Sequence, residues 1–391
     1  MQPKELLFIL LRSALSGEAL TEENKRIVEQ HLTKEALEAL FALSKKHDVA
    51  PLLAHSLEAN GLLLEKKELL APFSKEKMLA LFRYENMAHE LNALKEPLSQ
   101  NEIPFMPLKG AVLRRLYAEP FLRTSCDIDI LVRDADLPKA AQALCDTLKY
   151  KQKGERNFHD LSLYSESGVH LELHHNILEN VPALDRTLAR VWEHSAPLNE
   201  GGYEYAQSPA FLVFHIIAHM AYHFLCGGCG IRPFADLFLL KKEHAYKDED
   251  LALLLAESDL ETFFAHALSL CEVWFEGAPH TEQTLQMEAY LLCGGAYGTI
   301  KNSIAAKRQK GGKVYFVFSR LFVSYDYLKN LYPVLHKHKW LYPFMLVRRW
   351  GRLLFGGRLK HSVKQVQISQ QTDAAEAERI VSLMESLGLS L

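Results

Sequence analysis

Two aspartates lie one residue apart within an apolar stretch, residues 126–132, whose sequence is CDIDILV. On a β-strand, side chains at i and i+2 point to the same face, so Asp127 and Asp129 would project side by side. Two such carboxylates repel each other, and keeping both ionised costs free energy. A divalent cation removes this cost, and Mg²⁺ commonly uses one or two carboxylates together with substrate phosphates. The pair therefore indicates a catalytic metal site.

A second candidate strand supplies a third acid. In residues 169–174, VHLELH, the side chains of His170, Glu172 and His174 share the face opposite the leucines. If this strand lies beside the aspartates, Glu172 can join them around one or two metals, and two metals would stabilise both the attacking and the leaving oxygen of a phosphoryl displacement. An Asp-x-Asp pair alone also occurs by chance on exposed strands. The additional acid and the Lys-Gly turn described next favour the catalytic interpretation.

Lys109 and Gly110 follow a short apolar stretch, residues 103–108. Glycine lets the backbone approach a phosphate closely, and free N–H groups at a helix N-terminus bind anions, to which Lys109 would add a positive charge. Arg123 and Ser125 stand just before the acids and can reach phosphate oxygens. A plain β–α turn and a solvated surface are the alternative interpretations of these four residues.

The elements that must position these residues follow from hydrophobic spacing. Helical periodicity covers the N-terminal part, where Thr21 suits an N-cap, and a further helix is expected from about Ser74. Strand-like and helical stretches then alternate until helical periodicity returns at Ser208. The sequence therefore predicts an α+β fold in which a small mixed β-sheet core is flanked by N-terminal and C-terminal helical regions. The expected domains are 1–73, 74–204 and 205–391, and the expected core elements are strands at 103–108, 126–132, 160–165 and 169–177, the last two forming a hairpin, and helices at 109–117 and 134–148.

These motifs, in this order, resemble the nucleotidyltransferase superfamily of DNA polymerase β-like proteins, and most of all its bacterial branch of uncharacterised nucleotidyltransferases. The resemblance rests on Leu108-Lys109-Gly110, on the R-x-x-x-D-I-D-I-L-V run at 123–132, on Glu172-Leu173-His174 and on the histidine-containing segment 215–240, and it covers about 35–240. The branch has Lys-Gly where the wider superfamily often shows Gly-Gly or Gly-Ser.

The resemblance implies that Asp127, Asp129 and Glu172 hold Mg²⁺, or Mn²⁺ in its place, as the catalytic carboxylates. It implies transfer of a nucleoside monophosphate from an NTP such as ATP to an acceptor, with release of pyrophosphate. The nucleotide would be contacted by Lys109, Gly110, Arg123, Ser125 and His174.

A histidine stripe follows the core, since His215, His219 and His223 are spaced four residues apart on one predicted helix. With Cys226 and Cys229, His219 and His223 have the residue types of a zinc site. A single C-x-x-C in a glycine-rich break is weak evidence for metal. The preferred interpretation is a histidine face lining the cleft opposite the carboxylates, or simply a polar stripe between helices. The spacing of Arg232 and Asp236 predicts an ion pair along one helix.

Charge is unevenly distributed along the chain. Segment 301–364 contains fifteen Lys or Arg and one acid, Asp326, whereas the whole chain carries a net charge of −3. Such a segment suits solvated helix faces, RNA or an anionic membrane surface. The N-terminus shows no signal peptide, no apolar run is long enough to span a bilayer, and six scattered cysteines suggest reduced thiols, so a cytoplasmic location is expected.

Three functions are compatible with these residues. The first is a Mg²⁺-dependent nucleotidyltransferase that uses an NTP and a small-molecule or protein acceptor. The second is an RNA- or tRNA-modifying, toxin-like nucleotidyltransferase, which the basic segment would suit. The third is a catalytically silent binding or scaffold protein, which the intact set of three acids disfavours.

Overall fold

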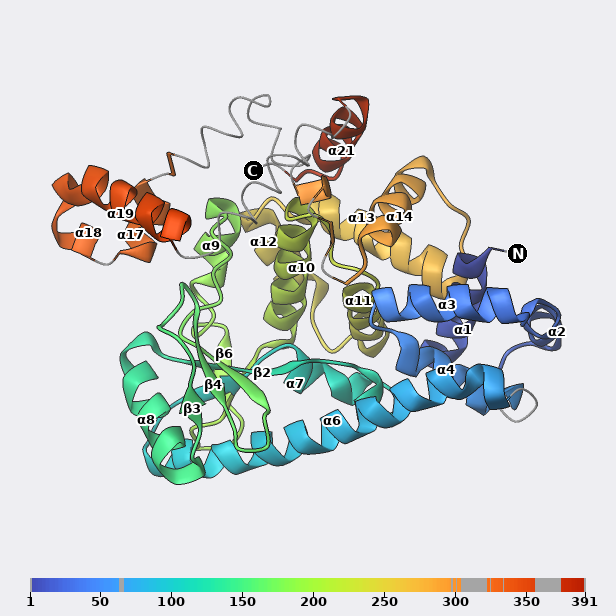
Figure 1. Cartoon of the computed structure of the whole chain (residues 1–391), viewed down its shortest axis with the longest axis horizontal. Helices are drawn as coiled ribbons and strands as arrows, with labels where there is room; N and C mark the ends of the chain where they lie inside the picture. The colour runs from blue at the N-terminus through green and yellow to red at the C-terminus, as the bar shows by residue number, and fades with distance from the viewer. Residues whose placement is uncertain are drawn as a thin grey trace.

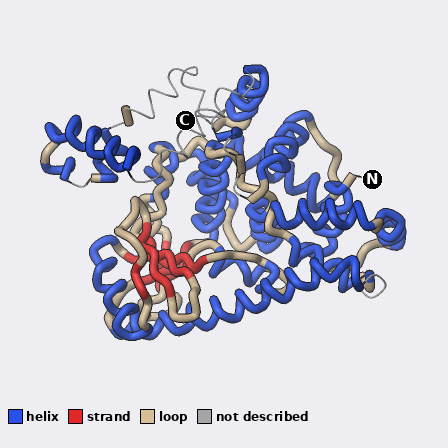
Figure 2. Tube along the Cα trace, viewed as in Figure 1, coloured by secondary structure: helices blue, strands red, loops and turns tan. Residues whose placement is uncertain are grey.

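A computed structural model of the protein describes residues 2–62, 67–296, 298–299, 301–303, 322–323, 325–332, 334–355 and 374–389. Its strands gather in one region, and helices surround them (Figure 2), so the predicted α+β class is confirmed. Among these residues, no helix combines the length and the apolar character that crossing a membrane requires.

The N-terminal part consists of α-helices, as predicted. Thr21 caps the second of them, because its side chain accepts a hydrogen bond from the N–H of Asn24. Helix α6 begins at Lys67, ahead of the predicted start at Ser74, and continues through Pro72. The helices are α1 (Pro3–Ser16), α2 (Glu22–His31), α3 (Lys34–Lys46), α4 (Ala50–Ala59) and α6 (Lys67–Gln100).

Helix α6 links the two halves of the fold. It runs beneath both the N-terminal helices and the sheet (Figure 1), and it contacts α4 near one end and α8 (Leu137–Leu148) near the other. The predicted boundary between residues 73 and 74 lies inside this helix.

The main sheet has five strands in the order β1-β2-β5-β4-β3. The two central strands, β2 and β5, are parallel, and the other neighbours are antiparallel. The predicted hairpin is confirmed, since β4 pairs with β5 across the turn at Gly168. The strands are β1 (Phe105–Pro107), β2 (Asp127–Val132), β3 (Lys151–Gln152), β4 (Asp160–Tyr164) and β5 (His170–His174).

The two faces of this sheet differ. On one face, Ile128, Ile130, Leu171 and Leu173 are buried in a core shared with α6 and α8. The acids occupy the opposite face. Leu131, which follows the two aspartates on that same face, is fully buried in the other large core of the molecule. This core covers the sheet next to the acids. The alternation within β2 and β5 thus buries the apolar side chains against α6 and α8 and places the carboxylates on the opposite face of the sheet.

The segment between β1 and β2 contains less helix than predicted. A single turn, α7 (Gly110–Leu113), is followed by two 3₁₀ turns, η1 (Arg114–Leu116) and η2 (Pro120–Leu122). The chain extends at Glu119, because the residue before a proline is disfavoured in the helical conformation.

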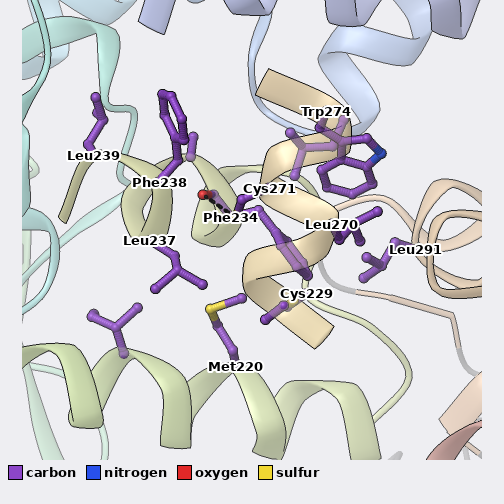
Figure 3. Close-up of a cluster of buried hydrophobic side chains, with 14 of the residues drawn as sticks. Met220, Cys229, Phe234, Leu237, Phe238, Leu239, Leu270, Cys271, Trp274 and Leu291 are labelled. Carbon is purple, nitrogen blue, oxygen red and sulfur yellow. Dashed lines mark hydrogen bonds between the residues drawn. The ribbon is translucent and has the colours of Figure 1, made fainter. Parts of the chain in front are cut away.

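The C-terminal helices share one core with the N-terminal helices. Figure 3 shows part of this core, where Met220 of α10 lies near Leu237 of α11, and the thiol of Cys271 on α13 donates to the carbonyl of Phe234 on α11 over 3.4 Å. Two short strands that the sequence did not predict precede these helices and form a separate sheet. The elements are α9 (Pro182–Leu188), β6 (Ser195–Pro197), β7 (Tyr205–Gln207), α10 (Pro209–Leu225), α11 (Arg232–Glu243), α12 (Asp248–Glu257), α13 (Glu261–Cys271), η4 (Glu272–Glu276) and α14 (Glu282–Gly294).

The remaining helices follow residue 322. Leu328, Tyr332, Leu335 and Leu346 form a small core of their own. Much of the basic segment 301–364 lies outside the described residues, so the predictions of RNA or membrane contact there stay predictions. The helices are α17 (Tyr325–Leu331), α18 (Val334–Lys337), η6 (Lys339–Leu341), α19 (Tyr342–Phe355) and α21 (Ala374–Ser386).

Candidate active site

The three predicted carboxylates come together on the open face of the sheet. Strands β2 and β5 are parallel neighbours, and their register places Asp129 opposite Glu172 and Asp127 opposite His170. Ligand-capable atoms of Asp127, His170 and Glu172 lie within 4.8 Å of one another, and so do those of Asp129, Glu172 and His174. The two groups share Glu172, which therefore lies between the two aspartates in a common cluster.

His174 connects the members of this cluster. Its Nε2 lies 2.9 Å from Oδ1 of Asp129 and 3.4 Å from Oε2 of Glu172. Burial lowers the pKa of His174, but the hydrogen bonds to both carboxylates outweigh burial and raise the pKa to about 9. The positive imidazolium thus offsets part of the negative charge, and its hydrogen bond fixes the orientation of Asp129.

The two aspartates experience opposite electrostatic environments. Burial, followed by repulsion from Asp129 and Glu172, raises the pKa of Asp127 above its ordinary value. Burial would also raise the pKa of Asp129, but attraction to Lys109 and His174 outweighs it and lowers that pKa well below the ordinary value. Asp129 is therefore held ionised, whereas Asp127 is the carboxylate that gains most from a bound cation.

The Lys109-Gly110 turn is tied directly to the aspartate strand, because the N–H of Leu108 donates to the carbonyl of Asp129 over 3.0 Å. Lys109 has φ 39° and ψ −106°, a conformation that side chains rarely adopt. A Cβ on Gly110 would lie 2.7 Å from Nη1 of Arg123. The turn is thus packed against the residues that precede the acids.

Arg123 and Ser125 are both held by protein groups. Arg123 is buried and makes a bidentate pair with Asp236, with distances of 2.9 Å and 2.8 Å. The hydroxyl of Ser125 accepts a hydrogen bond from Arg114 over 3.0 Å. The predicted Arg232–Asp236 pair is wrong, because Asp236 faces Arg123 and Nη1 of Arg232 instead lies 2.8 Å from a carboxylate oxygen of Asp48. Arg123 consequently joins the sheet side of the site to α11.

A cavity of about 240 Å³ lies above the carboxylates. The predicted residues Lys109, Gly110, Arg123 and Ser125 line it together with the three acids, and α10 contributes His219 and His223 to its wall. His174 lies beneath this cavity, nearly buried, against Asp129. The sheet and the helical region thus enclose one site, with carboxylates on one side and imidazoles on another.

The structure does not bring the possible zinc ligands together. Among the described residues, the groups with the spacing of a metal site are the two carboxylate–histidine groups on β2 and β5. Cys229 is buried and Cys226 follows the end of α10, while His219 and His223 contact each other.

Two residues near the site escaped the sequence analysis. His170 is not one of them, because the period of two had already placed it on the face of Glu172, where the structure has it. Arg114, which also hydrogen-bonds the carbonyl of Gly110, and Glu179, which contacts His219, lie in irregular or very short elements without a periodic signal.

Comparison with known proteins identifies the family of the chain. A family model described as an uncharacterised nucleotidyltransferase matches residues 33–276, more than half of the chain. The chain belongs to this family. The matched part of the chain contains α3, the sheet and helices α10 to α13, and therefore every residue of the carboxylate cluster. No curated protein and no solved structure was found to match the chain.

Proposed function

We propose that this nucleotidyltransferase moves a nucleoside monophosphate from an NTP to an acceptor in a reaction that depends on Mg²⁺, and that it belongs to the DNA polymerase β-like superfamily. The observation that carries the proposal is the cluster of Asp127, Asp129 and Glu172 on two paired strands beneath a cavity. Membership of a nucleotidyltransferase family supports the reaction type.

The donor atoms of this cluster fit a hard divalent cation. Asp127, Asp129 and Glu172 offer carboxylate oxygens from one face, and Mg²⁺ or Mn²⁺ prefers such ligands. Burial and repulsion from Asp129 and Glu172 raise the pKa of Asp127, and a cation would relieve the repulsion. When bound, the cation would neutralise charge on the phosphates of the NTP. His174 would act behind the ligands by orienting Asp129, as partners of metal-binding groups commonly do.

The nucleotide is proposed to lie over the Lys109-Gly110 turn. Lys109 supplies a positive charge at the cavity, and the turn brings backbone close to the carboxylates. Arg123 is assigned an indirect role, because Asp236 already binds its guanidinium on one edge, although its Nη1 still points toward Gly110. Ser125 completes the proposed nucleotide-binding set, whereas His174 lies beneath the cavity and supports Asp129 instead of contacting the nucleotide.

The three-acid cluster disfavours the catalytically silent alternative, since three clustered carboxylates are unfavourable without a ligand. An RNA acceptor would be suggested by the basic segment, much of which lies outside the described residues.

The direct test is to incubate the purified protein with each α-labelled NTP, Mg²⁺ and a cell extract, and to follow the label. We expect one or more NTPs to label an acceptor, and Glu172→Gln to abolish labelling. Glu166→Gln is the matched control, because Glu166 is exposed at the turn of the same hairpin. Equal labelling by both variants would contradict the assignment of Glu172.

A further inference from the structure

A chain of three side chains leads from the buried interior to the cavity. Oε1 of Glu179 lies 2.6 Å from Nδ1 of His219, and Nε2 of His219 lies 3.1 Å from Nε2 of His223. Both histidines line the cavity that holds the carboxylates, whereas Glu179 is buried behind them, 8% exposed. The carboxylate of Glu179 is thus followed by the imidazole of His219 and then by the imidazole of His223 at the cavity.

These contacts define where the protons lie. A carboxylate and a ring nitrogen at 2.6 Å share one proton, and two ring nitrogens at 3.1 Å share another. With Glu179 ionised, His219 carries its proton on Nδ1 and His223 carries its proton on Nε2. The lone pair of the chain is then on Nδ1 of His223, the position that can accept a proton from a bound molecule.

We propose that Glu179, His219 and His223 form the general base that removes the proton from an acceptor hydroxyl, so that the acceptor is an alcohol. This proposal rests on the proposed nucleotidyl transfer. As the acceptor oxygen bonds to the α-phosphorus, the bond from that phosphorus to the bridging oxygen breaks, and pyrophosphate leaves with the electron pair. The hydroxyl proton passes to Nδ1 of His223.

The chain can carry this proton away from the reaction. His223 passes its Nε2 proton to His219, and His219 passes its Nδ1 proton to Glu179, so that the charge change ends on the carboxylate. Burial raises the pKa of Glu179 to about 7, against opposing effects of Lys109 and His174 and a reinforcing one from Asp185. Burial also lowers the pKa of His223 to about 4, with Lys109 and Arg232 acting in the same direction, so the imidazole is neutral at pH 7 and retains its lone pair.

The charges of the cavity wall agree with a neutral acceptor. Lys109, one of three cations on this wall, is already assigned to the phosphates of the NTP. The other two are paired, Arg232 with Asp48 and Arg123 with Asp236. An anionic acceptor such as a phosphate would need free positive charge, and its ionised oxygen would need no base. A hydroxyl has the opposite requirements, since it is uncharged and reacts well only when a positioned base takes its proton.

The proton positions are tested in the absence of turnover. With the protein labelled with ¹⁵N-histidine at pH 8, two-bond ¹H–¹⁵N spectra should show His219 as the Nδ1–H tautomer and His223 as the Nε2–H tautomer. Spectra of His219→Gln and His223→Gln assign the signals. Finding His219 in the Nε2–H form would overturn the proposal.

The role in transfer is tested with two simple acceptors, glycerol as the hydroxyl probe and inorganic phosphate as the anionic probe. His223→Gln and Glu179→Gln should lower kcat for transfer to glycerol by about 10²–10⁴-fold and leave KM for the NTP unchanged. Free imidazole should partly restore a His223→Ala variant, which a purely structural loss would not allow. His89→Gln is the matched control, because His89 is exposed on α6.

Each outcome has a distinct meaning. Transfer that is lost in Asp129→Asn but normal in His223→Gln would overturn this proposal alone. A wild-type protein that transfers to no acceptor would overturn the proposed function and this proposal with it. Faster transfer to phosphate than to glycerol would overturn the assignment of an alcohol acceptor.

Discussion

Asp129 on β2 and Glu172 on β5 are direct partners in the register of two parallel strands. Residues 43 positions apart in the sequence are thereby held side by side, and the backbone pairing sets their separation. Asp127 joins them because it lies two residues before Asp129 on the same face. The geometry of the candidate metal site is thus a property of the sheet, and changes to these side chains should affect charge more than architecture.

The two aspartates should respond oppositely to loss of charge. Without metal, Asp127→Asn should raise the free energy of unfolding by about 1 kcal/mol, because repulsion is removed, and Asp129→Asn should lower it by a similar amount, because attraction to Lys109 and His174 is lost. Urea unfolding in EDTA measures both, with Asp250→Asn on the exposed face of α12 as the control. Destabilisation by both substitutions would contradict the assigned repulsion at Asp127.

Gly110 should tolerate no side chain. A Cβ there would approach the guanidinium of Arg123 to 2.7 Å and Ser125 to 3.4 Å, so Gly110→Ala should destabilise the protein by about 1–3 kcal/mol and weaken NTP binding. Gly351→Ala, on α19, is the matched control, because its Cβ would meet nothing within 4 Å. Thermal unfolding and NTP titration report the two effects, and equal behaviour of the two variants would contradict the tight packing of the turn.

The backbone conformation of Lys109 should lower the stability of the protein, and we expect this conformation to be kept because it places the lysine for NTP binding. Its φ of 39° is unfavourable for a side chain, by about 1–3 kcal/mol, whereas glycine adopts it readily. Lys109→Gly should therefore leave stability unchanged or raise it, although glycine usually destabilises, while NTP binding weakens and loses part of its salt dependence. Lys151→Ala on β3 is the control for charge. Unchanged NTP affinity in Lys109→Gly would show that the lysine does not contact phosphate.

Acid should destabilise the protein through His215. This histidine is 1% exposed, its Nδ1 is hydrogen-bonded to Gln207, and burial lowers its pKa to about 3. Because the unfolded chain binds this proton more tightly, stability is full above the ordinary pKa of about 6.5 and falls by up to about 1.4 kcal/mol per pH unit below it. Denaturant unfolding from pH 7.5 to 4.5 should show a smaller slope for His215→Gln than for the wild type. Identical slopes would mean that His215 is charged in the folded state.

The carboxylate site could be predicted from sequence because alternation is a local signal. Acids in β2, and histidines with one acid in β5, occupy every second position between buried apolar residues, and a period of two places them on one face whatever the neighbours are. The family motif added the order of the elements. These signals identified Asp127, Asp129 and Glu172 and the class of the fold.

Ion pairs and hydrogen bonds between residues far apart in the sequence could not be predicted in this way, because no local periodicity marks them. The i, i+4 spacing of Arg232 and Asp236 suggested a local ion pair, but the tertiary fold brings Arg123 to Asp236 and Asp48 to Arg232. Glu179 lies in a loop between β5 and α9, where no periodicity marks its direction. Its contact with His219 depends on how α10 packs over the sheet, which is set by the shared core and not by local sequence.

Position-specific labelling of the NTP tests the central claim most directly. The wild type, Glu172→Gln and Glu166→Gln are incubated with Mg²⁺, glycerol and the same NTP labelled either at the α- or at the γ-phosphate. Nucleotidyl transfer predicts that the α-label joins glycerol while the γ-label leaves as pyrophosphate, in the wild type and in Glu166→Gln but not in Glu172→Gln. Transfer of the γ-label to glycerol, or α-label transfer that survives in Glu172→Gln, would contradict nucleotidyl transfer at the three carboxylates.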